Sequence, residues 1–167
     1  QIPDSSIDVI GSDAVFEHLR NLPRVLQEFS RILKKDGILY ATFGPLWYTW
    51  GGDHISGADN QDNGYNHIVL SDEEYQKYLA SFGESPHSED DGRTWIINGL
   101  FSYLRPREYV DAMNAAGFTN MHLGMVIDPR AVGYLYRNPG IRRCKPHLDE
   151  IDWLITGMTF IYRKTSA

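Results

Sequence analysis

The chain has 167 residues, of which 42% are hydrophobic and 23% charged, a composition typical of one soluble globular domain. Its net charge of −6 and pI of about 5.4 provide no basic surface for DNA or RNA, so we expect no nucleic-acid partner. The single cysteine, Cys144, excludes an internal disulfide. No apolar run approaches the ~18 residues of a membrane span and no signal peptide is evident, so we expect a cytoplasmic protein without a membrane partner.

The first 43 residues predict a β–α–β unit. Ile7–Ser12 is short and rich in β-branched residues, which predicts a strand buried on both faces. From Asn21 onward, apolar residues recur every three or four positions and predict a helix that ends at Gly37. Ile38–Phe43 predicts the next strand, and the connection is long enough for a parallel crossover. The fold class is therefore α/β.

The middle of the chain, residues 44–104, has no such regular pattern and is predicted to be an insertion within one domain of residues 1–167. Its first part, residues 44–66, is a long loop rich in glycine, acidic and aromatic residues. Ser71 and Glu74 form a capping-box pattern that predicts a helix reaching about Phe82. Residues 83–93 are polar and acidic and predict a flexible surface loop.

The C-terminal third predicts two further strands. A helix over Pro106–Ala116 is followed by Phe118–Ile127, where alternating apolar residues predict a strand with one apolar face. A solvated loop and a short helix near His147–Trp153 come next. The last strand, Ile155–Tyr162, places Met158, Phe160 and Tyr162 on one face.

Several segments resemble class I S-adenosylmethionine-dependent methyltransferases of the type 11 kind. The resemblance rests on Pro3-Asp4, on the strand Ser6-Ile7-Asp8-Val9, on Phe16-Glu17-His18-Leu19 and on Arg31-Ile32-Leu33-Lys34-Lys35-Asp36-Gly37 before the next strand. Ile7 replaces the aromatic residue of the family, and Lys35-Asp36-Gly37 replaces its Pro-Gly-Gly. The segment Ser102–Phe118 resembles the helix and turn before the family's penultimate strand.

The resemblance implies a partial Rossmann-like methyltransferase sheet. It would contain the fourth to seventh strands of the family in the order 4, 5, 7, 6, with flanking helices and a helical insertion after the fifth strand. The family's glycine-rich cofactor turn has no counterpart here, so we expect roughly 60–100 family residues to be missing, at about 30 residues per βα unit. A fragment, a proteolysed species and a truncated gene product are all compatible with this expectation.

The resemblance also implies which residues approach the cofactor, S-adenosylmethionine. The end of the fourth strand maps to Ser12, Asp13 and Ala14, with His18 close behind; the alternative is a simple strand-to-helix turn. Glu17 and His18 allow three interpretations: a metal site, a catalytic base at His18, or a structural role in which His18 bonds the backbone and Glu17 faces solvent. The structural role is favoured because two adjacent side chains seldom supply a full ligand set.

The loop after the fifth strand faces the acceptor in this family. Trp47, Tyr48 and Trp50 are therefore predicted to line an acceptor pocket, and His54 to act as a catalytic base, the alternative being a histidine that caps a turn. Asp53, His54, His67 and His87 have no spacing typical of zinc ligands, so we expect no metal.

The predicted function is therefore methyl transfer to a small-molecule acceptor in the intact protein, with this chain supplying the acceptor side and part of the cofactor wall. Alone, the chain is expected to be inactive. The alternative is a non-catalytic half-domain that serves as an interaction module. In either case the outer edge of strand 7–12 would be open, which favours a homodimer or segment exchange.

Overall fold

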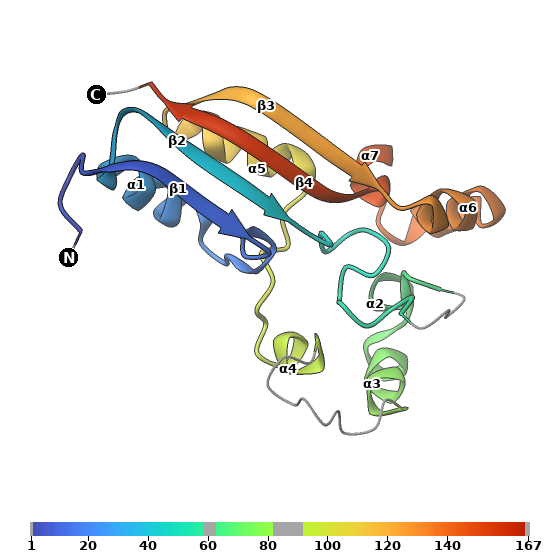
Figure 1. Cartoon of the computed structure of the whole chain (residues 1–167). Helices are drawn as coiled ribbons and strands as arrows, with labels where there is room; N and C mark the ends of the chain where they lie inside the picture. Colours follow the sequence, from blue (N-terminus) through green and yellow to red (C-terminus); the bar gives the residue numbers. More distant parts are fainter. Residues whose placement is uncertain (1, 59–62, 82–91, 166–167) are drawn as a thin grey trace.

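The computed structural model describes residues 2–58, 63–81 and 92–165. Its four strands are β1 (Ile7–Asp13), β2 (Leu33–Phe43), β3 (Phe118–Ile127) and β4 (Ile155–Lys164), in the order β1-β2-β4-β3. β1 and β2 are parallel, and β4 runs antiparallel to both of its neighbours. This mixed sheet confirms the α/β class and the predicted insertion of the last strand between the second and third (Figure 1).

Helices cover one face of the sheet. α1 (Leu22–Ile32) and α5 (Pro106–Ala115) lie behind the strands in Figure 1, and both begin with a proline in the first turn. The main core lies between these helices and the sheet, where Leu26 and Tyr109 are fully buried. Burying each such side chain stabilises the fold by about 1.5–3 kcal/mol. The strands supply alternate residues to this core: Leu39, Ala41 and Phe43 from β2, and Met158, Phe160 and Tyr162 from β4.

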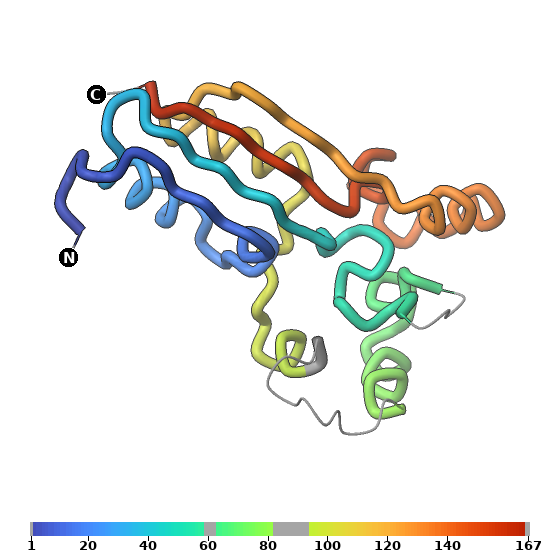
Figure 2. The backbone as a smooth tube through the Cα atoms, viewed as in Figure 1, coloured from blue at the N-terminus to red at the C-terminus, as the bar shows by residue number. Residues whose placement is uncertain are grey.

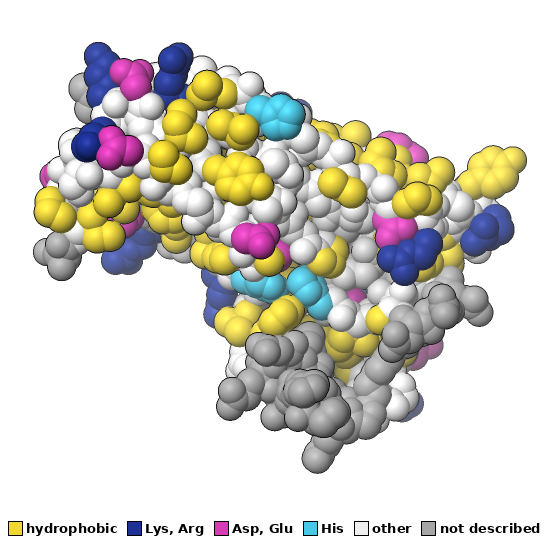
Figure 3. All heavy atoms as spheres, in the orientation of Figure 1, with side chains coloured by type: hydrophobic (Ala, Val, Ile, Leu, Met, Phe, Trp, Pro, Cys, Tyr) yellow, Lys and Arg dark blue, Asp and Glu magenta, His cyan; other side chains and the backbone are white. Residues whose placement is uncertain are grey.

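The other face of the sheet is open among the described residues, and Figure 3 shows hydrophobic side chains gathered on it. Val9 on this face is 61% exposed, and Tyr40 is also exposed. The prediction that the first strand is buried on both faces is therefore wrong, because no described helix covers its second face. β3 forms where predicted, but its expected apolar face is not buried: Met121, Met125 and Ile127 are exposed and Leu123 is only half-buried. The pairing with β4 shifts register at Asn120/His122 and at Val126/Ile127, which breaks the simple alternation.

Helix α1 is shorter than the sequence predicts. It ends at Ile32 and not at Gly37, and β2 begins directly at Leu33, whose side chain is fully buried in the core. Asp36 then turns the chain with a φ of 63°. A Cβ atom on Gly37 would lie 2.9 Å from the carbonyl oxygen of Lys34, so this position requires glycine.

The described part of residues 44–104, a segment predicted to be an insertion, extends beyond the carboxyl ends of β1 and β2, as the tube in Figure 2 shows. It contains α2 (Asn66–Val69), α3 (Asp72–Ser81) and α4 (Gly92–Ile97). Ser71 and Glu74 bond each other at the start of α3 as the capping box predicted. Phe82 and most of the predicted surface loop 83–93 lie outside the described residues.

Residues 129–144 form α6 (Pro129–Arg137) and a 3₁₀ helix (Pro139–Cys144), where the sequence had predicted a loop. The Asp128 carboxylate accepts a hydrogen bond from the Arg130 amide at 2.8 Å and caps α6. After the short helix α7 (Glu150–Leu154), the chain enters β4. A second apolar cluster joins these elements to the insertion through Trp50, Tyr65, Ile68, Ala131, Leu135, Ile141 and Trp153. None of the helices in the described part is long and apolar enough to cross a membrane.

Candidate functional site

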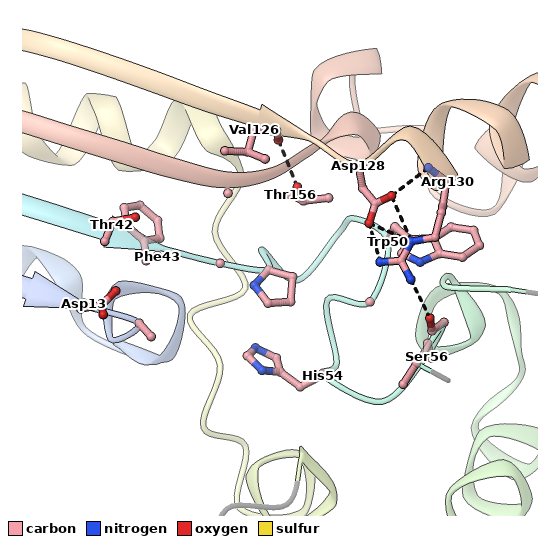
Figure 4. Close-up of a pocket in the computed structure, with 17 residues that line it drawn as sticks. Asp13, Thr42, Phe43, Trp50, His54, Ser56, Val126, Asp128, Arg130 and Thr156 are labelled. Atoms are coloured by element: carbon pink, nitrogen blue, oxygen red, sulfur yellow. Dashed lines mark hydrogen bonds and ion pairs between the residues drawn. The ribbon is translucent and has the colours of Figure 1, made fainter. Parts of the chain in front are cut away.

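A cleft of about 610 Å³ opens at the carboxyl ends of the parallel strands β1 and β2 (Figure 4). Ligands of open α/β sheets bind at this end of the strands, because the loops there diverge from the sheet. The walls come from the ends of β1 and β2, the loop after β2, the end of β3 with the residues that follow it, and the start of β4. The lining residues include Asp13, Ala14, Thr42, Gly44, Trp50, His54, Ser56, Asp128, Arg130 and Thr156.

The end of β1 brings two of the predicted cofactor residues to the cleft. Asp13 lies opposite Thr42 in the parallel ladder, and the Ala14 amide donates to the Thr42 carbonyl at 2.9 Å. Ala14 has a φ of 51°, an unfavourable conformation for a residue with a Cβ atom, and it turns the chain sharply after the strand. Asp13 and Ala14 therefore line the cleft, whereas Ser12 stays within the strand.

Glu17 is buried, with only 1% of its surface exposed, so the prediction that it faces solvent is wrong. Its Oε1 accepts a hydrogen bond from the Gly44 amide at 3.1 Å, which ties the 3₁₀ turn Phe16–His18 to the end of β2. Its Oε2 is buried and has no partner among the described residues. Burial raises the pKa of this carboxyl above its ordinary value, and the Gly44 hydrogen bond opposes that shift only in part.

His18 bonds the backbone, as the structural interpretation predicted. Its Nδ1 lies 2.7 Å from the carbonyl oxygen of Leu100. The imidazole also packs against Trp95 and Phe101, and its centre lies 5.2 Å from that of His54. His18 is thus held next to His54, which lines the cleft, although His18 itself is not among the lining residues.

The loop that presents His54 is organised by the fully buried Asp53. Its Oδ1 accepts the amides of Ile55 and Ser56 at 3.1 and 2.7 Å. Its Oδ2 accepts the hydroxyls of Ser56 and Tyr75 at 2.7 and 2.8 Å. Asp53 therefore has a structural role, and its four bonds fix the turn in which His54 adopts a φ of 63°.

His54 points from this loop toward the end of β1 in Figure 4. Its Nε2 is buried without a hydrogen-bond partner in the described part of the chain. Burial, assisted by the neighbouring His18, lowers the pKa of His54 to about 4. The imidazole is therefore neutral at pH 7 and offers a free lone pair, but a group of such low basicity is a weak proton acceptor.

Of the three aromatic residues predicted to line an acceptor pocket, only Trp50 reaches the cleft. Trp50 lines the cleft and packs edge-on against Tyr65. A Cβ on Gly64 would lie 2.2 Å from its indole, so close packing of the loop depends on that glycine. Trp47 packs instead on Phe101, and Tyr48 joins the second apolar cluster, so neither is among the lining residues.

The wall opposite β1 was not predicted. Arg130 pairs with Asp128 at 2.6 Å, donates to the Gly57 carbonyl at 3.1 Å, and lies 5.6 Å from the centre of the Trp50 ring. The Asp-Pro pair at 128–129 is typical of a helix start, but its place beside the cleft depends on the β3–β4 pairing. Together, the walls offer carboxylates, hydroxyls, one guanidinium and one indole face, which suits a small polar ligand.

Three titratable side chains meet beside the cleft. Glu17, His18 and His54 each offer a ligand atom, and these atoms all lie within 4.8 Å of one another. Sequence spacing gave no indication of this group, because His54 comes from a different loop. His67 does not join them: its Nε2 lies 2.7 Å from the Trp47 carbonyl, while His87 is outside the described residues.

Comparisons with known proteins support the resemblance. Residues 1–41 match a family model described as a methyltransferase domain. A search of curated proteins found no match to the chain. Among solved structures, the chain is similar to a Haemonchus contortus phosphoethanolamine N-methyltransferase 2, with a TM-score of 0.50 and 13% identity, over 99% of this chain and 35% of that one.

Two bacterial structures are similar at lower scores. One is an S-adenosylmethionine-dependent methyltransferase from Mesorhizobium loti, with 14% identity and a TM-score of 0.49, over 97% of this chain and 63% of that one. The other is a geranyl diphosphate C-methyltransferase from Streptomyces coelicolor, with 12% identity and a TM-score of 0.46, over 96% and 48%. The chain thus spans roughly half of the solved structures that it resembles.

Proposed function

We propose that this chain, whose first 41 residues match a methyltransferase domain, supplies the acceptor side and part of the cofactor wall of an S-adenosylmethionine-dependent methyltransferase. The observation that carries the proposal is the cleft at the carboxyl ends of β1 and β2, where Asp13 and Ala14 come from the segment covered by the family match. The same cleft receives the loop after β2, so that a cofactor wall and an acceptor wall would face each other.

Asp13 and Ala14 would lie against the cofactor. The turn at Ala14 exposes backbone at the end of β1, where a ligand can approach closely. The Asp13 carboxylate can accept hydrogen bonds from an ammonium or hydroxyl group. Ser12 and His18 would support this wall from behind, since neither is among the residues that line the cleft.

Trp50, His54 and Ser56 would meet the acceptor, a small molecule. Methyl transfer is a direct displacement, so orienting the acceptor atom toward the methyl group supplies much of the rate. The neutral imidazole of His54 would accept a hydrogen bond from the acceptor and orient it. Its lowered pKa argues for this positioning role over the predicted role as a catalytic base. Trp47 and Tyr48 would shape the loop from behind.

The proposal is tested by methyl transfer from S-adenosylmethionine labelled in its methyl group, using the product of the complete reading frame and a panel of small hydroxyl, amine and carboxylate acceptors. We expect label to enter an acceptor, and we expect Asp13→Ala to reduce the transfer at least tenfold. A product that retains a folded cleft but transfers no label, and that also fails to bind S-adenosylhomocysteine, would contradict the proposal.

A second candidate function is an interaction module. The open face of the sheet favours it, since Val9 and Val126 are 61% and 57% exposed there and β1 forms an edge of the sheet. An uncovered edge strand beside an apolar face favours pairing with another polypeptide, including a second copy of this chain. An interaction module must associate with another polypeptide but need not transfer a methyl group. Light scattering, which detects association, therefore distinguishes this function from that of a methyltransferase.

A further inference from the structure

The Glu17, His18 and His54 group has the chemistry of a metal centre. We propose that these three side chains bind one divalent transition-metal ion such as Zn²⁺ or Co²⁺. The proposal revises the expectation of no metal, which rested on sequence spacing alone.

The geometry brings the three ligands together from two separate segments. Glu17 and His18 lie in the 3₁₀ turn after β1, and His54 lies in the loop after β2. Their ligand atoms fall within 4.8 Å of one another. Bonds of about 2.0–2.2 Å to one ion place ligand atoms about 3–4 Å apart, so small side-chain rotations complete the arrangement.

Two of the three side chains hold a buried polar atom that lacks a partner. The Oε2 atom of Glu17 and the Nε2 atom of His54 have no hydrogen-bond partner among the described residues. Only 1% of the surface of Glu17 is exposed. Leaving buried polar atoms unpaired destabilises a fold, and such atoms in a native structure call for an explanation such as an ion. A shared cation would satisfy both at once.

The orientation of His18 also suits a metal ligand. A carbonyl oxygen can only accept, so the short contact to Leu100 requires a proton on Nδ1 of His18. In the neutral imidazole this leaves the lone pair on Nε2. Metal-binding histidines are commonly fixed in this way, with the second ring nitrogen donating to a backbone carbonyl.

The ligand types select the ion. Two imidazoles and one carboxylate suit Zn²⁺ and its neighbours in the first transition row, whereas Mg²⁺ and Ca²⁺ prefer oxygen ligands. Three protein ligands leave a position open, and His54 borders the cleft. If the proposed methyl transfer is correct, that position would take a hydroxyl or carboxylate oxygen of the acceptor, and His54 would then orient the acceptor through the ion and not by a direct hydrogen bond. Ion binding itself does not depend on that activity.

The test is a titration of the full chain with Co²⁺ and Zn²⁺, in a Cys144→Ser background that removes the exposed thiol. Calorimetry should show one equivalent of ion bound at micromolar concentration or below, and Mg²⁺ should bind at least a hundredfold more weakly. His54→Gln and His18→Gln should each weaken Zn²⁺ binding at least tenfold. The matched control is His122→Gln, which removes an exposed histidine on β3 and should leave binding unchanged.

A second measurement needs no variant. Co²⁺ should broaden the amide resonances of Gly44 and Leu100 first, because these residues bond Glu17 and His18 directly. Absence of a bound equivalent, undiminished binding in both folded His→Gln variants, or broadening centred on His122 would each overturn the proposal. Binding of Zn²⁺ by this chain, together with a complete product that transfers no methyl group, would support the metal site and count only against the proposed activity.

Discussion

The strongest test of how the site is built is the substitution Asp53→Ala. Asp53 is fully buried, and its carboxylate accepts two backbone amides and two hydroxyls. In the alanine variant the hydroxyls can turn to other acceptors, but the amides of Ile55 and Ser56 cannot. A buried donor left unpaired costs about 1–3 kcal/mol, so we expect the free energy of unfolding to fall by about 2–4 kcal/mol.

Urea unfolding followed by tryptophan fluorescence measures this loss. Asp53→Asn keeps one carbonyl oxygen for the amides and should lose about 1–2 kcal/mol, again from the hydrogen-bond costs. Asp111→Ala is the matched control: it removes an exposed carboxylate 3.6 Å from Arg107 on α5, and its effect should be close to zero. Because Asp53 fixes the turn of His54, Asp53→Ala should also weaken Zn²⁺ binding. An unfolding free energy within 0.5 kcal/mol of the wild type would refute the assigned role of Asp53, on the same hydrogen-bond scale.

Three further predictions concern the core, pH and association. Phe160 is fully buried against Phe16 and Phe43, so Phe160→Ala should lose about 3–5 kcal/mol in urea unfolding, whereas the exposed Met121→Ala should lose almost nothing; equal losses would contradict the assigned core. Burial lowers the pKa of His67 below its ordinary 6.5, so below pH 6.5 the unfolded chain takes up a proton that the folded chain does not. Stability should therefore fall more between pH 7.5 and pH 5.5 in the wild type than in His67→Gln, and equal slopes would argue against this burial effect. Light scattering should show dimers at tens of micromolar that Val9→Lys reduces, and a clean monomer would argue against pairing through β1.

The sheet and its two covering helices were predictable because their signals are local. Alternation at Met158, Phe160 and Tyr162 predicts one buried strand face, and the helical period after Asn21 predicts the stripe that covers it. The end of α1 was less predictable: Leu33 adopts extended dihedral angles and begins β2 with its side chain in the core, so the lysines fall in the strand and not in the helix. Helix α6 was missed although Asp128 and Pro129 carry a normal start signal.

The site depended on contacts that the sequence pattern does not contain. Glu17 is buried because its carboxylate accepts the Gly44 amide, 27 residues away. The approach of His54 to His18 depends in turn on how Asp53 closes its loop. The residue type alone suggested that each histidine could act in binding or catalysis, but only the folded chain brings His18 and His54 together.

The most direct test of the central claim is the binding of S-adenosylhomocysteine, measured by calorimetry for this 167-residue chain and for the product of its complete reading frame. We expect the complete product to bind at micromolar concentrations or below, and Asp13→Ala to weaken that binding at least tenfold. The 167-residue chain should bind at least a hundredfold more weakly. Sub-micromolar binding by this chain alone would contradict the account, as would a complete product whose affinity is unchanged by Asp13→Ala.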